Sequence, residues 1–242
     1  MILSVGHTKG GVGKSTLAIQ IATYLKYQDK TRPNVWLVDT DPQRSASKAV
    51  IERNSNPLYT KLSAASYLDG KELTQQVKNQ EHLWNEIIID IGARDSNSFR
   101  AALMLSDVLL IPVIPRIFDL EALSELYALL EAAWCLDAKV KAFAILSCTD
   151  QNVTFNKQAR EFIENNYPKI EFLDAPVARR KAIGMSSAFG ISVFEEKKPD
   201  EKACAEIEKL VQSLYPNISA KITANSLIEK KKVQSNKKKG DK

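Results

Sequence analysis

The stretch at residues 6–17, which reads GHTKGGVGKSTL, decides how the rest of this chain folds. Its second half matches the phosphate-loop pattern G-x-x-x-x-G-K-[ST], although the first glycine of that pattern falls on Thr8. A second lysine, Lys9, stands five residues before the lysine that the pattern requires. An apolar run precedes the stretch and apolar residues at helical spacing follow it, which is the strand–loop–helix context of a phosphate loop.

This pattern has a direct chemical interpretation. Glycines let backbone N–H groups surround phosphate oxygens, and the N-terminus of the following helix adds partial positive charge. Lys14 is expected to reach the β- and γ-phosphates of a nucleotide, and the Ser15 hydroxyl to bind Mg²⁺. A glycine-rich turn with incidental lysines is the competing interpretation, which the G-K-S-T ending and its flanks disfavour. We predict nucleotide binding by Lys9, Gly10, Gly11, Val12, Gly13, Lys14, Ser15 and Thr16.

Three aspartates stand at the ends of predicted strands. Asp90 ends the apolar run IIID, where phosphate-loop enzymes place a carboxylate that holds Mg²⁺ directly or through water. Asp39 and Asp41 lie in VDTDPQ, and two carboxylates this close repel each other unless a cation or donor lies between them. A magnesium nucleotide supplies that cation, so that one carboxylate is free to orient water while the other holds metal or lysine. Taken alone, each aspartate would also suit a turn or a helix cap.

Short apolar runs alternate with helical patterns along the whole chain. Strands are predicted at residues 2–6, 35–39, 86–91, 107–115, 140–147 and 170–173, and helices after residue 13 and around residues 120–130 and 203–214. The run EIIIDI is apolar on both faces, as a buried parallel strand must be. The pattern predicts an α/β fold with a doubly wound, mainly parallel sheet, helices on both faces and ligands at the carboxyl ends of the strands.

Length and composition set the limits of this fold. A chain of 242 residues with 44% hydrophobic and 26% charged residues suits one soluble α/β domain. No basic segment with an apolar core opens the chain, so we expect no signal peptide. No apolar run reaches the roughly 18 residues of a membrane span. The three cysteines are widely spaced, which favours a reducing cytoplasm over a disulfide framework or a zinc site.

Positive charge is concentrated at the C-terminus. Residues 221–242 hold eight lysines and two acids, a net charge of +6, which leaves −1 for residues 1–220 because the whole chain carries +5. Few large apolar residues accompany these lysines, so we predict a domain at residues 1–216 and a lysine-rich, disordered tail at residues 217–242. Contact with nucleic acid, contact with anionic lipid, and a role in solubility alone are all open for the tail.

The order of three motifs, KGGVGKST, VDTDPQ and IIIDIG, resembles that of the ParA/MinD family of deviant Walker A ATPases, which are phosphate-loop NTPases. The segments ALMLSDVLLIPVIPRIFDLEAL and APVARRKAIGMSSAFGISVFE resemble later parts of that family, so the likeness covers about residues 1–214. The first motif is highly specific, and the later segments are individually weak. After Asp90 the sequence IGARDSNSFR departs from the family's usual turn, which leaves Arg94, Asp95 and Arg100 as candidates for sensing hydrolysis.

The resemblance implies roles that spacing alone leaves undecided. A second cation beside Lys14 suits negative charge that develops at a transition state. The family's equivalent of Lys9 reaches the nucleotide of a partner subunit in an ATP sandwich dimer. Asp41 matches the water-positioning aspartate, and Asp39 matches the carboxylate that supports the metal and this lysine. By resemblance, the catalytic residues are therefore Lys9, Lys14 and Asp41, and the metal ligands are Ser15, Asp39 and Asp90.

Several branches of the family fit this chain poorly. Its cysteines do not form the pair of nitrogenase-type iron proteins, and it ends in lysines rather than in a tyrosine cluster. The tail makes a poor amphipathic membrane helix, and we expect no helix-turn-helix domain before Ile2. The resemblance therefore implies a short ParA-type partition ATPase, a Mg-ATP-dependent homodimer with a weak basal rate that binds nucleoid DNA without sequence preference.

Two groups of basic residues are candidates for DNA contact. The resemblance places Arg179, Arg180 and Lys181 at such a position, although a solvated basic turn is the competing interpretation. Charge alone favours the tail lysines Lys230, Lys231, Lys232, Lys237, Lys238 and Lys239.

The resemblance also implies partners and a place in the cell. A small ParB-like adaptor on the cargo is expected to stimulate hydrolysis, in the cytoplasm and at the nucleoid, without stable membrane insertion. Two alternatives stay open: a MinD-type membrane-associated positioning ATPase, and a nucleotide-dependent transferase or metal-cluster carrier on the same fold.

Overall fold

The computed structural model describes residues 1–28, 34–116, 120–149 and 153–216. Within these residues one parallel sheet has the strand order β3-β2-β4-β1-β5-β6-β7, and the short β8 pairs with β6. The strands are β1 (Ile2–Val5), β2 (Val35–Asp39), β3 (Ser63–Ser66), β4 (Glu86–Asp90), β5 (Val108–Val113), β6 (Lys141–Thr149), β7 (Ile170–Phe172) and β8 (Val177–Ala178).

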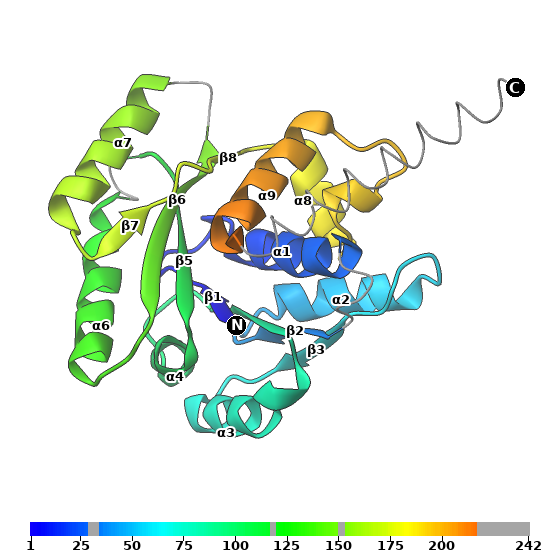
Figure 1. The fold of residues 1–242 in the computed structure, drawn as a ribbon, viewed down its shortest axis with the longest axis horizontal. Coiled ribbons are helices and arrows are strands. Elements are labelled where there is room, and N and C mark those ends of the chain that lie inside the picture. Colours follow the sequence, from blue (N-terminus) through cyan, green and yellow to red (C-terminus); the bar gives the residue numbers. More distant parts are fainter. Residues whose placement is uncertain (29–33, 117–119, 150–152, 217–242) are drawn as a thin grey trace, which may run out of the picture.

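Helices cover both faces of this sheet (Figure 1). One face carries α1 (Lys14–Gln28), α2 (Ser45–Ser55), α8 (Lys181–Ala188) and α9 (Glu201–Leu214). The other carries α3 (Gly70–Gln80), α4 (Asn97–Leu105), α6 (Leu123–Cys135) and α7 (Val153–Asn166). Two short 3₁₀ turns, η1 (Glu81–Leu83) and η2 (Val193–Glu195), complete the described elements.

The central strands are apolar because both of their faces are buried. In β4 the side chain of Ile88 joins the core beneath α1 and α9, whereas Ile87 and Ile89 join the core beneath α3 and α4. This alternation follows from the two-residue period of a strand. The predicted doubly wound α/β fold with helices on both faces is therefore confirmed.

The sequence did not predict two of the strands, β3 and β8. The strand β3 has the sequence SAAS, which lacks the β-branched and aromatic residues that favour strands, and it pairs only with β2 within the described sheet. The strand β8 has two residues, and its register against β6 is irregular. Both strands form through tertiary pairing rather than through a local pattern.

Strand register brings the three sequence motifs to one edge of the sheet. In β1 Val5 lies opposite Asp90 of β4, and in β2 Asp39 lies opposite the same residue. The phosphate loop leaves this edge after β1, and the loop with Asp41 leaves it after β2. Because parallel strands end together, the predicted site assembles at their carboxyl ends.

Candidate functional site

The phosphate loop connects β1 to α1 and depends on two glycines. Gly11 and Gly13 have φ angles of 79° and 96°, in the left-handed region that other residues rarely adopt. A Cβ atom on Gly13 would lie 2.9 Å from the Ser147 hydroxyl oxygen, so the loop rests closely against the end of β6. The Leu17 N–H donates to the Gly13 carbonyl at 2.9 Å, and helical hydrogen bonding begins there.

The structure also explains why Thr8 can replace the first glycine of the pattern. Thr8 has no positive φ angle, so its backbone does not require glycine. Its hydroxyl donates to the carbonyl of Ala122 at 3.4 Å. The following residue, Lys9, donates its backbone N–H to Nδ1 of the buried His7 at 3.0 Å.

Lys14 stands at the first position of α1, and its ammonium group is buried. Its Nζ donates to the carbonyl of Lys9 at 2.8 Å, which ties the helix start back to the loop. Burial lowers the pKa of Lys14, whereas the nearby carboxylates of Asp90 and Asp41 oppose this shift. A buried ammonium between a loop and two carboxylates is placed to receive anionic oxygens.

Asp90 carries a carboxylate without a good hydrogen-bond partner. Its side chain is completely buried, and among the described residues neither of its oxygens makes a hydrogen bond of acceptable geometry. Burial raises its pKa to about 8, while the nearby Ser15 hydroxyl and Lys14 partly offset this rise. A buried carboxylate that its own chain leaves unsatisfied requires an external partner, and a cation is the natural one.

Asp39 organises the loop that follows β2. Its Oδ1 accepts the N–H of Asp41 at 3.0 Å, and its Oδ2 accepts the N–H of Ser47 at 2.8 Å. Burial raises the pKa of Asp39, and these two backbone hydrogen bonds reduce the rise. Asp41 is only partly buried, and its Oδ1 accepts the N–H of Gln43 at 2.8 Å. The two aspartates thus differ in role: Asp39 is buried and holds the loop in place, whereas Asp41 is partly exposed.

A cavity of about 780 Å³ opens in front of these residues. This volume lies within the range of small-molecule sites. Its wall contains parts of the phosphate loop, of the loops after β2 and β4, of the end of β6 and of β8 and α8. From the predicted site the wall includes Gly10, Gly11, Gly13, Lys14, Ser15, Thr16 and Asp41. Lys9 is partly exposed, but it does not line this cavity.

The cavity, with Ser15 in its wall and the buried Asp90 carboxylate beside Ser15, fits a magnesium nucleotide. Ser15 and Asp90 lie close together, and the orphaned carboxylate of Asp90 supplies the anionic oxygen that Mg²⁺ prefers. The described residues contain no group of three His, Cys, Asp or Glu side chains placed to hold a metal. A Mg²⁺ ion here would take its remaining ligands from phosphates and water, as this ion usually does.

The predicted DNA-contacting residues have different surroundings. Arg179 is exposed and lines the rim of the cavity, and Lys181 is exposed at the start of α8. The Arg180 guanidinium makes two hydrogen bonds to the Glu206 carboxylate of α9, at 2.9 and 2.6 Å. The tail lysines at positions 230–232 and 237–239 lie outside the described residues.

Sequence reasoning missed several parts of the cavity wall. Ser147 and Cys148 lie at the end of β6, in a segment without a motif. Val177 in β8 and Ile183 in α8 lie in the late segment that resembles the family, but the resemblance assigned them no role. Their apolar atoms suit the face of a base, but only the tertiary fold brings them to the phosphate loop. Cys148 has a φ angle of 50°, which is a strained backbone that no sequence pattern signals.

The parallel sheet, the phosphate loop with its two lysines, and the aspartates Asp39, Asp41 and Asp90 at or just after strand ends define a phosphate-loop nucleotide-binding protein of the deviant Walker A type. Comparison with known families agrees. The profile described as the CobQ/CobB/MinD/ParA nucleotide-binding domain matches residues 3–193. The chain belongs to this family, and its domain is a nucleotide-binding ATPase domain of the ParA/MinD type.

Individual relatives and solved structures cover nearly the same region. The chain is 27% identical to the maintenance of carboxysome distribution protein A of Halothiobacillus neapolitanus, over 89% of this chain and 96% of that protein. It is 24% identical to protein ParA of Rhizobium radiobacter, over 86% and 91%. The fold is similar to septum site-determining protein MinD of Pyrococcus horikoshii complexed with Mg-ADP, with a TM-score of 0.66, 18% identity and coverage of 88% and 95%.

The helices of the described chain are too short or too polar to cross a bilayer.

Proposed function

We propose that this chain is a partition ATPase that closes into a sandwich dimer on Mg-ATP, binds DNA without sequence preference and positions a cargo. The observation that carries the proposal is the placement of Lys9. Lys14 already serves the phosphates of its own subunit, whereas Lys9 is partly exposed and lies off the wall of its own cavity. A lysine so placed suits the nucleotide of a second subunit.

We assign the roles in ATP hydrolysis to a few residues. Lys14 binds the β- and γ-phosphates, and Asp41 orients the attacking water. Asp39 holds Asp41 in place, because it accepts the N–H of Asp41 and thereby fixes the loop. Ser15 and Asp90 would hold Mg²⁺, which would supply positive charge next to the phosphates. If Lys9 of the partner supplies the last cation, the isolated subunit hydrolyses slowly, which accounts for the proposed weak basal rate.

A pair of variants tests the dimer. We expect Lys9→Ala to bind ATP as a monomer, without dimerisation and without stimulated hydrolysis. The matched variant Asp41→Ala should bind ATP and form a dimer that persists, because it keeps the phosphate site and loses the water-positioning group. Light scattering with ATP and a phosphate-release assay measure both properties. A normal dimer and normal hydrolysis in Lys9→Ala would contradict the trans role.

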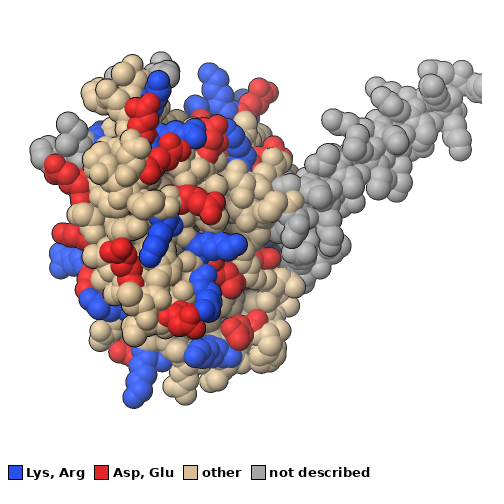
Figure 2. Space-filling model, turned by 60° about the vertical axis from the view of Figure 1, so that its left-hand side comes forward, with Lys and Arg blue, Asp and Glu red and all other residues tan. Residues whose placement is uncertain are grey.

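Contact with DNA is proposed for Arg179, Lys181 and the tail. Arg179 and Lys181 are exposed, and a dimer would present each of them twice. Arg180 can contact DNA only if it exchanges the Glu206 carboxylate for a phosphate. We therefore expect it to contribute less to DNA affinity than Arg179 and Lys181. Figure 2 shows Lys and Arg interspersed with Asp and Glu on the face in view, without a broad patch of one sign. Such a face does not attract DNA.

The cargo is proposed from the relatives. One relative is named for the distribution of carboxysomes and another is named ParA, so the cargo is either a protein body or a DNA molecule. In both cases we propose a small ParB-like adaptor on the cargo that stimulates hydrolysis. Candidate adaptors encoded beside this chain should raise phosphate release in the presence of DNA, and failure of all of them would remove this part of the proposal.

A MinD-type membrane-associated ATPase is the competing function, with the tail as a lipid-binding switch. Flotation with anionic liposomes and binding to non-specific duplex DNA, each with ATP and with ADP, separate the two functions. We expect ATP-dependent DNA binding, and nucleoid localisation of a fluorescent fusion in the cytoplasm. ATP-dependent flotation without DNA binding would favour the membrane function.

A further inference from the structure

The loop after β4 brings an arginine to the nucleotide cavity. Gly92 packs so closely against the loop after β2 that a Cβ atom on it would lie 3.1 Å from Asp41 Cα. Its N–H donates to the Thr40 hydroxyl at 3.3 Å. Arg94 follows two residues later and lines the same cavity as Lys14 and Asp41. The part of the wall that carries Arg94 is therefore the part beside the predicted water-positioning loop.

Asp95 in this loop is paired with Arg100 in the following helix α4. Asp95 and Arg100 form two hydrogen bonds, at 2.8 and 2.5 Å, and both side chains are exposed. This pair holds the pKa of Asp95 below its usual range, because the Arg100 guanidinium favours the ionised carboxylate. Among the described residues Arg94 makes no hydrogen bond or ion pair of its own. Of the three candidates for sensing hydrolysis, Arg94 is the one that lines the cavity, and among the described residues its guanidinium has no partner.

The backbone of Arg94 adds an independent observation. Its φ angle is 103°, well inside the region that favours glycine. A side chain kept at such a position costs stability, and strained residues cluster at sites where the strain serves ligand binding. Glycine would suit this backbone better, so local backbone preference does not explain an arginine here.

We propose that Arg94 contacts the γ-phosphate of ATP from within its own subunit and lets the loop after β4 distinguish ATP from ADP. This inference rests on the proposed function, since it takes ATP as the ligand. A guanidinium matches the oxygens of a terminal phosphate with two parallel N–H donors. Lys14 serves both nucleotides, whereas a cation on the loop beside Asp41 meets an oxygen that ADP lacks.

Two affinities test the proposal: those for a non-hydrolysable ATP analogue and for ADP, both with Mg²⁺. They are measured at a protein concentration where light scattering shows a monomer. Arg94→Ala should weaken binding of the analogue about tenfold or more, as the loss of a charge-assisted hydrogen bond does, and change ADP binding by less than about twofold. Arg100→Ala is the matched control, because it removes an exposed guanidinium from the same region, and it should alter neither affinity.

A glycine variant separates contact from folding. Arg94→Gly should weaken binding of the ATP analogue as much as Arg94→Ala does. Its Tm should nevertheless equal or exceed that of the wild type, because glycine adopts this φ angle without strain. Equal weakening of both nucleotides, or no change in either, would overturn the contact with the γ-phosphate. Wild-type protein that binds neither nucleotide would instead refute the proposed function itself.

Discussion

Lys14 places a buried ammonium group beside the carboxylates of Asp90 and Asp41. Its replacement by alanine leaves the phosphates of the nucleotide without their main cationic partner inside the chain. A charge-assisted hydrogen bond contributes about 1.5–3 kcal/mol, so Lys14→Ala should lose about tenfold or more in ATP affinity. Isothermal titration measures the loss, and the exposed Lys48→Ala on α2 serves as control. Unchanged affinity would contradict the phosphate-loop assignment.

Asp90 leads to a prediction about pH. Burial raises its pKa to about 8, whereas an unfolded aspartate titrates near the ordinary value of 3.8. Since the folded state holds this proton more tightly, the ligand-free protein loses stability as pH rises between these two values, and the loss is complete above the folded pKa. Asp90→Asn cannot ionise, so we expect its stability relative to the wild type to increase over this range.

Urea unfolding without Mg²⁺ or nucleotide, at about pH 5 and about pH 9, measures this difference. Other titrating groups largely cancel between the variant and the wild type. The same variant should lose the Mg²⁺ dependence of nucleotide binding, because the amide is a poorer metal ligand than the carboxylate. Parallel pH profiles for the two proteins would show that Asp90 has a compensating partner.

At the scale of elements, the residue patterns determined some parts of the site and not others. The apolar runs predicted β1, β2 and β4, because buried parallel strands read as continuous apolar segments, and helical spacing predicted α1. The helices α2 and α4 that follow β2 and β4 were not predicted. The roles of the loop glycines and of the aspartates near strand ends could be predicted from local chemistry. The strand β3 and the part of the cavity wall formed by β6, β8 and α8 could not be predicted in this way, because they depend on contacts between residues far apart in the chain. The positive φ of Arg94 was equally invisible.

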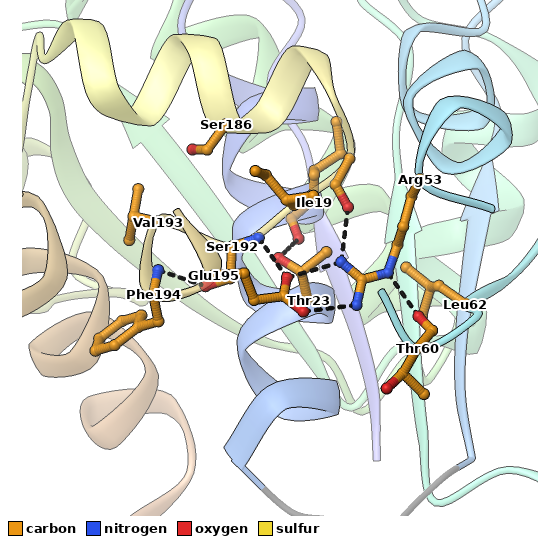
Figure 3. A network of polar contacts seen from close by, with 12 residues as sticks. Ile19, Thr23, Arg53, Thr60, Leu62, Ser186, Ser192, Val193, Phe194 and Glu195 are labelled. Atoms are coloured by element: carbon orange, nitrogen blue, oxygen red, sulfur yellow. Dashed lines mark hydrogen bonds and ion pairs between the residues drawn. The ribbon is translucent and has the colours of Figure 1, made fainter. Parts of the chain in front are cut away.

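Another contact between residues far apart in the chain joins α2 to η2 (Figure 3). Arg53 is fully buried, and its guanidinium makes two hydrogen bonds to the Glu195 carboxylate, at 2.7 and 2.8 Å. It also donates to the carbonyls of Thr60 and Gly190, at 2.8 and 3.1 Å. Glu195 in turn accepts the N–H of Ser192 at 2.8 Å. The network fixes α2, which follows the Asp41 loop, against the segment after α8.

We expect Arg53→Ala to destabilise the fold strongly, because it leaves the largely buried Glu195 carboxylate and two carbonyls without their partner. Breaking a buried pair on one side costs about 3–5 kcal/mol. Urea unfolding measures the change, and Glu52→Ala, an exposed neighbour on α2, should stay within about 0.5 kcal/mol of the wild type. The double variant Arg53→Met/Glu195→Met should recover part of the loss, since it removes both charges. If Arg53→Ala has the same free energy of unfolding as the wild type, water replaces the guanidinium as the partner of Glu195, and the prediction is wrong.

At the scale of the whole molecule, the charge balance separates the domain from its C-terminal segment. Residues 1–220 carry a net charge of −1, and residues 221–242 carry +6. A nearly neutral domain gains little from long-range attraction to DNA, and the face in view in Figure 2 carries charges of both signs. Affinity must then come from a small basic site that the dimer presents twice, from the tail, or from both.

Removal of residues 221–242 distinguishes these sources. Each DNA phosphate that a lysine neutralises contributes about −0.9 to the slope of log K against log salt concentration. If the tail lysines bind phosphates, the truncated protein should bind DNA more weakly with a slope flatter by a few units, while ATPase activity without DNA changes little. Sequence preference should stay absent, because contacts to phosphate carry no base information. Fluorescence anisotropy over a series of salt concentrations measures both affinity and slope.

The opposite result has an equally specific consequence. If Arg179, Arg180 and Lys181 form the main site, truncation leaves affinity and slope intact, and the triple alanine variant of these residues abolishes binding instead. We expect both sources to contribute, with different dependence on nucleotide. The site near α8 exists twice only in the ATP dimer, so it should supply the ATP-dependent part, and the tail should add affinity that persists with ADP. Truncated protein with full affinity and an unchanged slope would leave the tail a role in solubility alone.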